Sequence, residues 1–227
     1  MRFFAGIFVG IVISFQSIAL DLSSLNKNDA VNGLRDALTQ SSIVAVSKLG
    51  VENGFLGNDK VKIPLPDVLN RMNGALRMLG MQKQADDLVI AMNRAAEYAI
   101  PETKTLLVGA VKNMSVQDAK GILSGSDTSA TEYFRKTTRD QLTQKLLPIV
   151  TKATAHVGLA EQYNNFASQG VQLGLVDAKQ AKIENYVTQK TLDGLFLMMA
   201  EQEKAIRNDP IGSATGMARK VFRLLEK

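Results

Sequence analysis

Apolar residues recur every three or four positions along most of the chain, which is the spacing of one face of an α-helix. The clearest stripe comprises Ala85, Leu88, Val89, Met92, Ala95, Ala96 and Ala99. The same spacing predicts further helices over residues 24–49, 66–79, 101–111, 116–123, 128–156, 159–173, 185–207 and 217–225. The chain therefore reads as one helix after another, with no internal repeat.

Helix ends are marked by local signals. Gly50, Gly80 and Gly158 each follow an apolar stripe, where glycine is favoured beyond a helix C-terminus. Ser115-Val116-Gln117-Asp118 resembles a capping box, and Asp127 or Thr128 is expected to cap the next helix. Pro148 predicts a kink or a break inside that helix.

Residues 58–66 depart from the helical pattern. Val61-Lys62-Ile63-Pro64-Leu65-Pro66 alternates apolar residues with polar residues or prolines, and the prolines exclude a central strand. We expect an extended segment that covers the core with its apolar side chains. A lid or a peptide-binding edge is the alternative, because long loops in compact domains are often functional. The predicted fold is all-α: a single compact domain of about eight to ten helices, with one extended Pro-containing segment near residues 58–66.

The first nineteen residues have the layout of a secretory signal. A charged Met1-Arg2 precedes an apolar stretch from Phe3 to Phe15, and Ser17-x-Ala19 offers the small residues of a cleavage site. Thirteen helical residues reach roughly 20 Å, short of a hydrocarbon core of about 30 Å. We predict cleavage near Ala19 and export to the periplasm, which leaves residues 20–227 as one helical domain without a transmembrane segment. An uncleaved anchor and a buried N-terminal helix are the alternatives.

Composition narrows the possible chemistry. The chain has no cysteine, which excludes disulfides, thiol nucleophiles and a cysteine-linked lipid anchor. His156 is the only histidine, so we expect no metal site, and we expect no cofactor. Because His156 precedes Gly158, we expect it in the last turn of a helix, where the helix dipole favours a positive charge. Neither a Gly-x-Ser-x-Gly elbow nor a phosphate-binding loop occurs.

The charge balance bears on the partner. The chain has 27 Lys and Arg against 22 Asp and Glu, a formal charge of +5. This excess suits a solvated surface or an affinity for an anionic envelope component. No Lys/Arg run with interleaved aromatics occurs, so nucleic acid is not an expected partner.

The most distinctive polar group is Asn93, Arg94 and Glu97, which flank the clearest apolar stripe. Their spacing of three and four residues places them on one helix surface. If buried, the Arg–Glu pair needs further hydrogen-bond partners. Candidates for that role, and for a shared polar network or ligand pocket, are Tyr133, Arg135, Lys190 and Asp193. A network that locks helix packing, a polar ligand pocket and a catalytic carboxylate at Glu97 are the three interpretations.

Several short stretches of the sequence are informative only when they are taken together. They are Asp29-Ala30, Gly33-Leu34, Ala37-Leu38, residues 61–66, Met92-Asn93-Arg94-Ala95-Ala96-Glu97, Asp118-Ala119-Lys120-Gly121-Ile122-Leu123, Tyr133-Phe134-Arg135, Thr137-Thr138, Tyr186-Val187-Thr188-Gln189-Lys190 and Leu192-Asp193-Gly194-Leu195-Phe196. Together they resemble the DUF4197 family of small exported bacterial proteins over nearly all of the chain after the signal. The resemblance implies a helical exported protein and carries no activity and no catalytic residue. The family tends to be acidic before its Tyr-Val-Thr stretch, whereas residues 181–185 are mixed here, so no role for an acidic cluster is carried over.

The resulting functional expectation is a non-catalytic binding or structural role in the cell envelope. The partner would be an envelope protein, an anionic envelope component or an apolar ligand. The competing hypothesis is an envelope hydrolase that uses the carboxylate of Glu97 or of another acidic residue. The two differ in whether Glu97 faces an open pocket with a second carboxylate or closes on an arginine within a packed interface.

Overall fold

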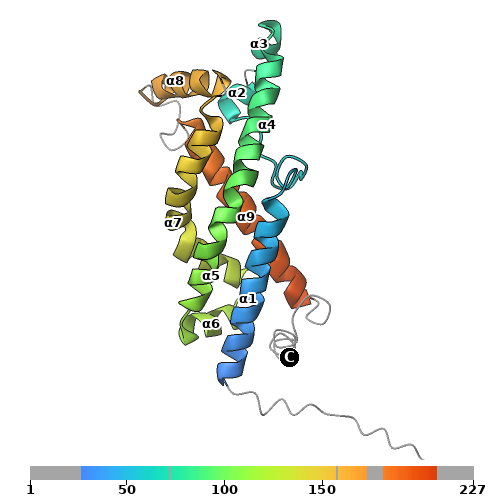
Figure 1. Cartoon of the computed structure of the whole chain (residues 1–227), viewed down its shortest axis with the longest axis vertical. Coiled ribbons are helices and arrows are strands. Elements are labelled where there is room, and N and C mark those ends of the chain that lie inside the picture. The colour runs from blue at the N-terminus through green and yellow to red at the C-terminus, as the bar shows by residue number, and fades with distance from the viewer. Residues whose placement is uncertain (1–26, 72, 157, 173–180, 209–227) are drawn as a thin grey trace, which may run out of the picture.

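The computed structural model describes residues 27–71, 73–156, 158–172 and 181–208 (Figure 1). In chain order its helices are α1 (Lys27–Leu49), α2 (Asp67–Arg71), α3 (Asn73–Met78), α4 (Gln82–Ala99), the 3₁₀ turn η2 (Ile100–Thr103), α5 (Lys104–Lys112), α6 (Val116–Leu123), α7 (Ser129–Thr154), α8 (Gly158–Gln172) and α9 (Ile183–Asn208). The described residues contain no strand, and the predicted all-α class is confirmed. The predicted signal, its cleavage site and the helix predicted over residues 217–225 lie outside the described residues.

The long helices form an elongated bundle. Helices α1, α4, α7 and α9 share the body of the molecule, with α7 packed on α9 and α4, and α1 packed on α5 and α9 (Figure 1). Helices α2, α3 and α8 gather at one end of the long axis, and α6 lies toward the other end. None of the helices in the described ranges is long and apolar enough to cross a membrane.

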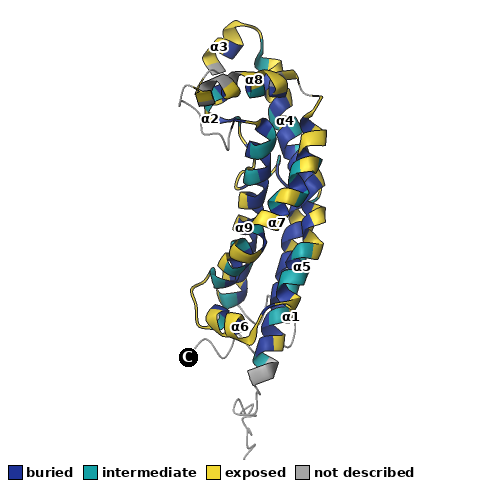
Figure 2. Cartoon of the chain, turned by 90° about the vertical axis from the view of Figure 1, so that its left-hand side faces the viewer, coloured by how far each residue is buried: buried dark blue, intermediate teal, exposed yellow. Residues whose placement is uncertain are grey.

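Helix α4 shows why the apolar stripe predicts the core. Ala85, Leu88, Met92, Ala95, Ala96 and Ala99 are all buried, and Val89 packs against the same core. The opposite face of α4 is exposed, as Figure 2 shows for the long helices in general. Pro101 lacks a backbone N–H, which ends α4 and starts the short 3₁₀ turn before α5. Burial of alanines lets the neighbouring helices approach α4 closely.

The helix-end predictions have mixed outcomes. Ser115 and Asp118 form the predicted capping box, with the Ser115 hydroxyl accepting from the Asp118 N–H at 3.0 Å. Helix α7 continues through Pro148, so a break there is wrong. Pro148 is exposed, while Leu146 and Val150 on either side are fully buried and hold the helix against its neighbours. The helix predicted over residues 66–79 is found as α2 and α3.

Two other predicted features are corrected. His156 is exposed and lies beyond the end of α7 at Thr154, not in its last turn. Thr128 occupies the position before α7, but its side chain makes no capping hydrogen bond. The cap is supplied instead by a side chain far away in the sequence, as described below.

Candidate functional site

Residues 50–66 form a loop that leads from α1 to α2 and contacts α4 and α9. Its first turn needs special backbone geometry, because Asn53 has φ of 64° in the left-handed region. Gly54 lies so close to the end of α1 that an added Cβ would be 2.4 Å from the Leu49 carbonyl oxygen. The loop is thus folded tightly onto the C-terminus of α1, and its path is fixed from the start.

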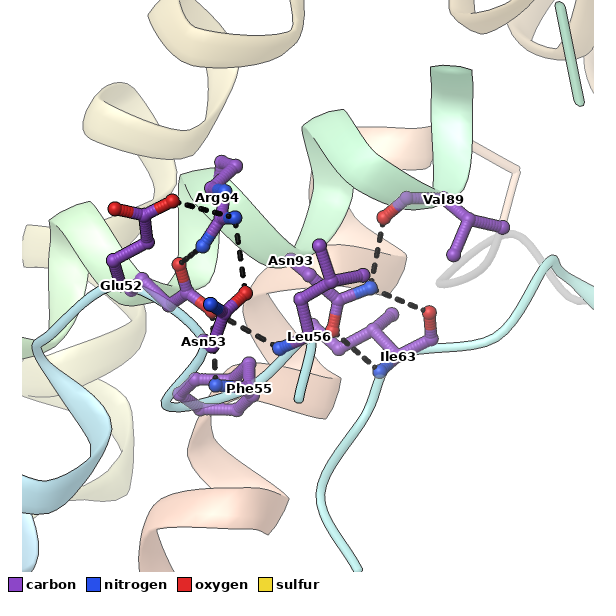
Figure 3. Close-up of polar contacts among 9 residues, drawn as sticks. Glu52, Asn53, Phe55, Leu56, Ile63, Val89, Asn93 and Arg94 are labelled. Atoms are coloured by element: carbon purple, nitrogen blue, oxygen red, sulfur yellow. Dashed lines mark hydrogen bonds and ion pairs between the residues drawn. The ribbon is translucent and has the colours of Figure 1, made fainter. Parts of the chain in front are cut away.

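The side chain of Glu97 holds this turn to α4. Its Oε1 accepts hydrogen bonds from the backbone N–H groups of Phe55 and Leu56, both at 3.0 Å (Figure 3). Its Oε2 accepts from Nη1 of Arg94 at 2.6 Å. With a residue exposure of 5%, the carboxylate is buried and used on both oxygens. A buried carboxylate with three donors is a satisfied charge, which is the condition for keeping it in a core.

Arg94 joins Glu97 to the outer side of the turn. Its Nη2 lies 3.0 Å from Oδ1 of Asn53 and 3.2 Å from Oε1 of Glu52 (Figure 3). The Arg94 side chain is 36% exposed, whereas that of Glu52 is 80% exposed. Exposure of this kind makes the Glu52 pair weak, because water screens it. The Arg94 contacts therefore position the turn more than they stabilise it.

Asn93 fixes the second half of the loop. Its Oδ1 accepts from the N–H of Ile63 at 2.8 Å, and its Nδ2 donates to the Ile63 carbonyl at 2.9 Å. The same Nδ2 also donates to the Val89 carbonyl at 2.8 Å, one turn back in α4 (Figure 3). Asn93 is fully buried. It pairs with both peptide groups of one extended residue, as a neighbouring strand would.

Apolar contacts press the loop onto α9 as well. Phe55, Val61 and Ile63 are buried, so the extended segment covers the core as expected. An added Cβ at Gly194 of α9 would lie 2.8 Å from Phe55 Cε1 and 3.2 Å from Val61 Cβ. Glycine at position 194 therefore makes room for the loop between α4 and α9.

The pKa of Glu97 reflects this environment. Burial pushes the pKa of the Glu97 carboxyl upward, but the hydrogen bonds from Leu56, Arg94 and Phe55 together outweigh it. The net result is a pKa below the ordinary value of 4.5. Glu97 is therefore an ionised acceptor at neutral pH and not a proton donor.

The structure divides the predicted polar group into two. Asn93, Arg94 and Glu97 meet the loop, whereas the other four residues lie on α7 and α9. The Tyr133 hydroxyl donates to the Ala110 carbonyl at 3.1 Å, and the Lys190 ammonium lies 5.7 Å from the centre of the Tyr186 ring. The expected role of Arg135 or Lys190 as a partner of Glu97 is wrong, because backbone groups of the loop occupy that place.

The remaining two residues of that group meet each other across α7 and α9. Asp193 accepts from Arg139 Nη2 at 3.0 Å and lies 4.0 Å from Arg135 Nη1. The Arg135 guanidinium also stacks over the Phe196 ring, 4.9 Å from its centre. These pairs are half exposed and join two neighbouring helices. The seven residues thus make their polar contacts in two groups, one on the loop and α4 and the other on α7 and α9.

A second buried carboxylate was not anticipated from the sequence. Glu203 of α9 accepts from the backbone N–H groups of Ala130 and Thr131, both at 2.9 Å, and so caps α7. Its Oε1 also pairs with Nη2 of Arg207 at 3.0 Å, and Arg207 donates to the Ile122 carbonyl at 2.9 Å. The spacing of Glu203 and Arg207 is the one available signal, but it also fits an ordinary surface pair.

Two hollows of the described part are lined by residues other than Asn93, Arg94 and Glu97. One, of about 10 Å³, lies between α1, α7 and α9 and is lined by Ala37, Leu38, Ser41, Ala130, Thr131, Phe134, Met199, Glu203 and Ile206. It has room for about one water molecule. An open polar groove of about 600 Å³ runs between α7, α8 and the start of α9. Among the described residues, no group of three His, Cys, Asp or Glu side chains is placed to hold a metal ion.

Comparisons with known proteins place the chain in a family. Neither the curated proteins nor the solved structures contain a match to it. A family model described as "Protein of unknown function (DUF4197)" matches residues 24–223, nearly the whole chain, which confirms the resemblance drawn from the sequence motifs. The chain therefore belongs to the DUF4197 family.

Proposed function

We propose that the protein is an exported, non-catalytic helical protein of the cell envelope that works by binding a partner through its outer surface. The observation that carries the proposal is the use of Glu97. Both of its oxygens accept hydrogen bonds from the protein's own Phe55, Leu56 and Arg94. This arrangement supports a packed interface at Glu97 over an open pocket, which were the two alternatives that the sequence left.

The hydrolase alternative requires a carboxylate that can reach a substrate. A general acid also needs a pKa raised toward the working pH, whereas the pKa of Glu97 is lowered by its hydrogen bonds. The lowered pKa of Glu97 therefore suits an ionised hydrogen-bond acceptor with a structural role. In this proposal Asn93, Arg94 and Glu97 hold the loop of residues 50–66, and the surface contacts the partner.

An apolar ligand inside the bundle is less well supported than a surface partner. The hollow between α1, α7 and α9 is about 10 Å³, whereas sites for small molecules usually exceed about 300 Å³. The net charge of +5 favours an anionic partner in the envelope.

Cell fractionation combined with crosslinking tests the proposal. The tagged protein should be found in the envelope or periplasmic fraction, and a crosslinker should join it to envelope material above the level seen with an unrelated exported helical protein. Glu97→Gln should keep this crosslinking at a temperature where the variant is folded. Retention in the cytoplasm, crosslinking no stronger than the control, or loss of crosslinking in a folded Glu97→Gln variant would each contradict it.

A further inference from the structure

We propose that the α8 groove, defined as the open groove between α7, α8 and the start of α9, binds a neutral saccharide of a few sugar residues through Glu161, Asn165 and Asn185. The proposal rests on the surface-binding role proposed above and adds to it a ligand class and a place on the surface. Three features of the described residues carry it: the size of the groove, a set of polar side chains without partners, and a carboxylate that is already held in position.

The groove has the size and the lining of a site for a polar molecule. Its volume of about 600 Å³ lies within the range of about 300–1,000 Å³ that is typical of small-molecule sites. Such sites are usually lined by apolar side chains. Of the nine described residues that line this groove, eight carry polar or charged side chains and only Leu147 is apolar. The lining therefore favours a ligand that is recognised through hydrogen bonds.

Four of the lining side chains have no hydrogen-bond partner among the described residues. They are Glu161 and Asn165 of α8, and Lys182 and Asn185 at the start of α9. Asn185 is half-buried, so its carboxamide loses part of its contact with water and gains no hydrogen bond from the described chain. Each carboxamide offers two donors and an acceptor, and the Glu161 carboxylate offers acceptors only. These side chains are therefore available to a ligand.

A fifth polar group of the groove, the carboxylate of Glu184, is held in position. The Nδ2 group of Asn164 donates to both of its oxygens, at 3.0 and 3.2 Å. The Oδ1 atom of Asn164 accepts from the N–H of Ile183 at 2.7 Å, which links α8 to the first turn of α9. Because each carboxylate oxygen has two lone pairs, both oxygens of Glu184 can still accept a hydrogen bond from a ligand. An acceptor that is ordered before binding loses less conformational entropy when the ligand arrives.

The mixture of donors and acceptors selects the class of ligand. A hydroxyl group both donates and accepts, which matches the carboxamides and the carboxylates of the groove. An anion would face Glu161 and Glu184, and Lys182 is the one cation among the described lining residues. The described residues place no third acidic or histidine ligand there for a metal ion. The apolar side chains of a peptide would find only Leu147 to cover them. A neutral saccharide, which is dense in hydroxyl groups, fits the groove best.

Binding of short saccharides tests the proposal against probes of other chemistry. The protein is purified with its N-terminus defined by intact mass and is titrated by isothermal titration calorimetry. The neutral probes are tri-N-acetylglucosamine and maltotriose. Tri-galacturonic acid is the charged saccharide of the same length, and tri-alanine is the peptide probe. Sedimentation of the protein with isolated peptidoglycan sacculi distinguishes a glycan strand from a free saccharide as the source of the ligand.

The first variant removes the two carboxamides that have no partner. Asn165→Ala with Asn185→Ala is matched by Asn32→Ala with Asn113→Ala, which are exposed and do not line the groove. The parent should bind at least one neutral trisaccharide, and should bind tri-galacturonic acid and tri-alanine more weakly. The groove variant should lose about tenfold in affinity, because two hydrogen-bonding side chains are gone, and the control should bind like the parent.

The second variant tests the carboxylate and does not depend on the fold of α9. Glu161→Gln keeps one acceptor oxygen and removes the charge of an exposed side chain, so about fivefold in affinity should be lost. Its control is Glu201→Gln, which lies farther along α9 and does not line the groove. Circular dichroism should show both groove variants to be folded, since neither removes a hydrogen bond among the described residues.

Three outcomes would overturn the proposal. The first is a parent protein that binds neither neutral trisaccharide. The second is groove variants that bind as well as their controls. The third is tighter binding of tri-galacturonic acid or of tri-alanine, which would indicate an anionic ligand or a peptide. Sedimentation with sacculi that falls in the groove variants assigns a glycan strand, and trisaccharide binding without sedimentation assigns a free saccharide; both support the groove.

The failure of this proposal is distinguishable from the failure of the proposed function. If saccharide binding is absent while envelope crosslinking persists, only the saccharide site is lost. If saccharide binding is present while the protein stays in the cytoplasm, the envelope role is lost and the groove keeps its ligand.

Discussion

Glu97 and Glu203 are two buried carboxylates that do related work in different parts of the molecule. Each is 5% exposed and accepts hydrogen bonds from two successive backbone N–H groups of a distant segment. Each also pairs with an arginine on its own helix, Arg94 for Glu97 and Arg207 for Glu203. The same arrangement of a buried carboxylate and two backbone N–H groups thus fixes the loop of residues 50–66 at Glu97 and caps the start of α7 at Glu203.

The difference lies in what surrounds each carboxylate. The N–H groups of Ala130 and Thr131 open α7, where the helix dipole adds to the attraction for a negative charge. The Arg207 side chain is only 11% exposed, against 36% for Arg94. Removal of Glu203 would therefore break an ion pair with a nearly buried guanidinium and uncap a central helix. Removal of Glu97 would free the loop of residues 50–66. Arg94 on α4 would still be in contact with water, because its side chain is 36% exposed.

The largest effect is expected for Glu203→Gln. The glutamine keeps the shape but removes the charge, and its amide N–H₂ faces a donor where the second oxygen stood. Because the buried ion pair with Arg207 and the charged cap of α7 are both lost, we expect a loss of about 3 kcal/mol in the free energy of unfolding. Thermal unfolding should shift down by roughly 6–12 °C, measured by circular dichroism. A shift no greater than that of a surface variant would contradict the capping role.

Glu97→Gln should cost less, about 2 kcal/mol, because the loop keeps its apolar anchors and Arg94 can be solvated. The loss of stability should be confined at first to the loop of residues 50–66. In hydrogen exchange, the amides of Phe55 and Leu56 should lose protection in this variant while α7 stays protected. Equal loss of protection in α7 would show that the two carboxylates are not independent.

Acid should weaken the Glu97 contact in a defined range. The pKa of Glu97 is lowered in the folded protein, so its stabilising contribution is fully present above the ordinary value of 4.5. It is lost as pH falls below 4.5 and through the folded pKa. The difference in unfolding free energy between the parent and Glu97→Gln should therefore shrink at acid pH, as measured by urea denaturation at pH 7 and in steps downward from 4.5. If this difference in unfolding free energy stayed constant or grew as the pH fell, the predicted direction of the pH dependence would be wrong.

The smallest effect is expected for Glu201→Gln, which serves as the control. Glu201 pairs with Lys60 at 2.6 Å, but the two side chains are 34% and 63% exposed. Exposed pairs contribute about 0–1 kcal/mol. The variant should unfold within about 0.5 kcal/mol of the parent in the same urea titrations. A loss as large as that of Glu97→Gln would mean that charge, and not burial, decides the order.

Much of the fold follows from local pattern, and the residues of α4 show why. The buried side of that helix repeats at helical spacing, so its core face could be read from the sequence. The proximity of Asn93, Arg94 and Glu97 was also predictable, because it depends only on their spacing within one helix. The capping box at Ser115 is local in the same sense.

Their partners could not be predicted, because those are backbone groups distant in the sequence. Glu97 meets amides 41 and 42 residues away, and Asn93 meets a peptide 30 residues away. Backbone amides carry no signature of residue type, so side chains such as Arg135 and Lys190 looked equally suitable. Glu203 was missed for the same reason: it caps α7 from 72 and 73 residues away, while Thr128 beside the helix does not.

Local patterns in the sequence are enough to predict the helical class, the buried face of α4, the extended Pro-containing segment and the family. These depend on periodicity, on proline chemistry and on motifs that lie within short stretches. Three features emerge only from the packed helices: Glu97 and Asn93 bind the loop, Glu203 caps the start of α7, and Met78 and Leu79 are exposed where α3 ends. Each of these depends on which backbone groups and surfaces the folded chain brings together, and that is set by the packing of all the helices at once.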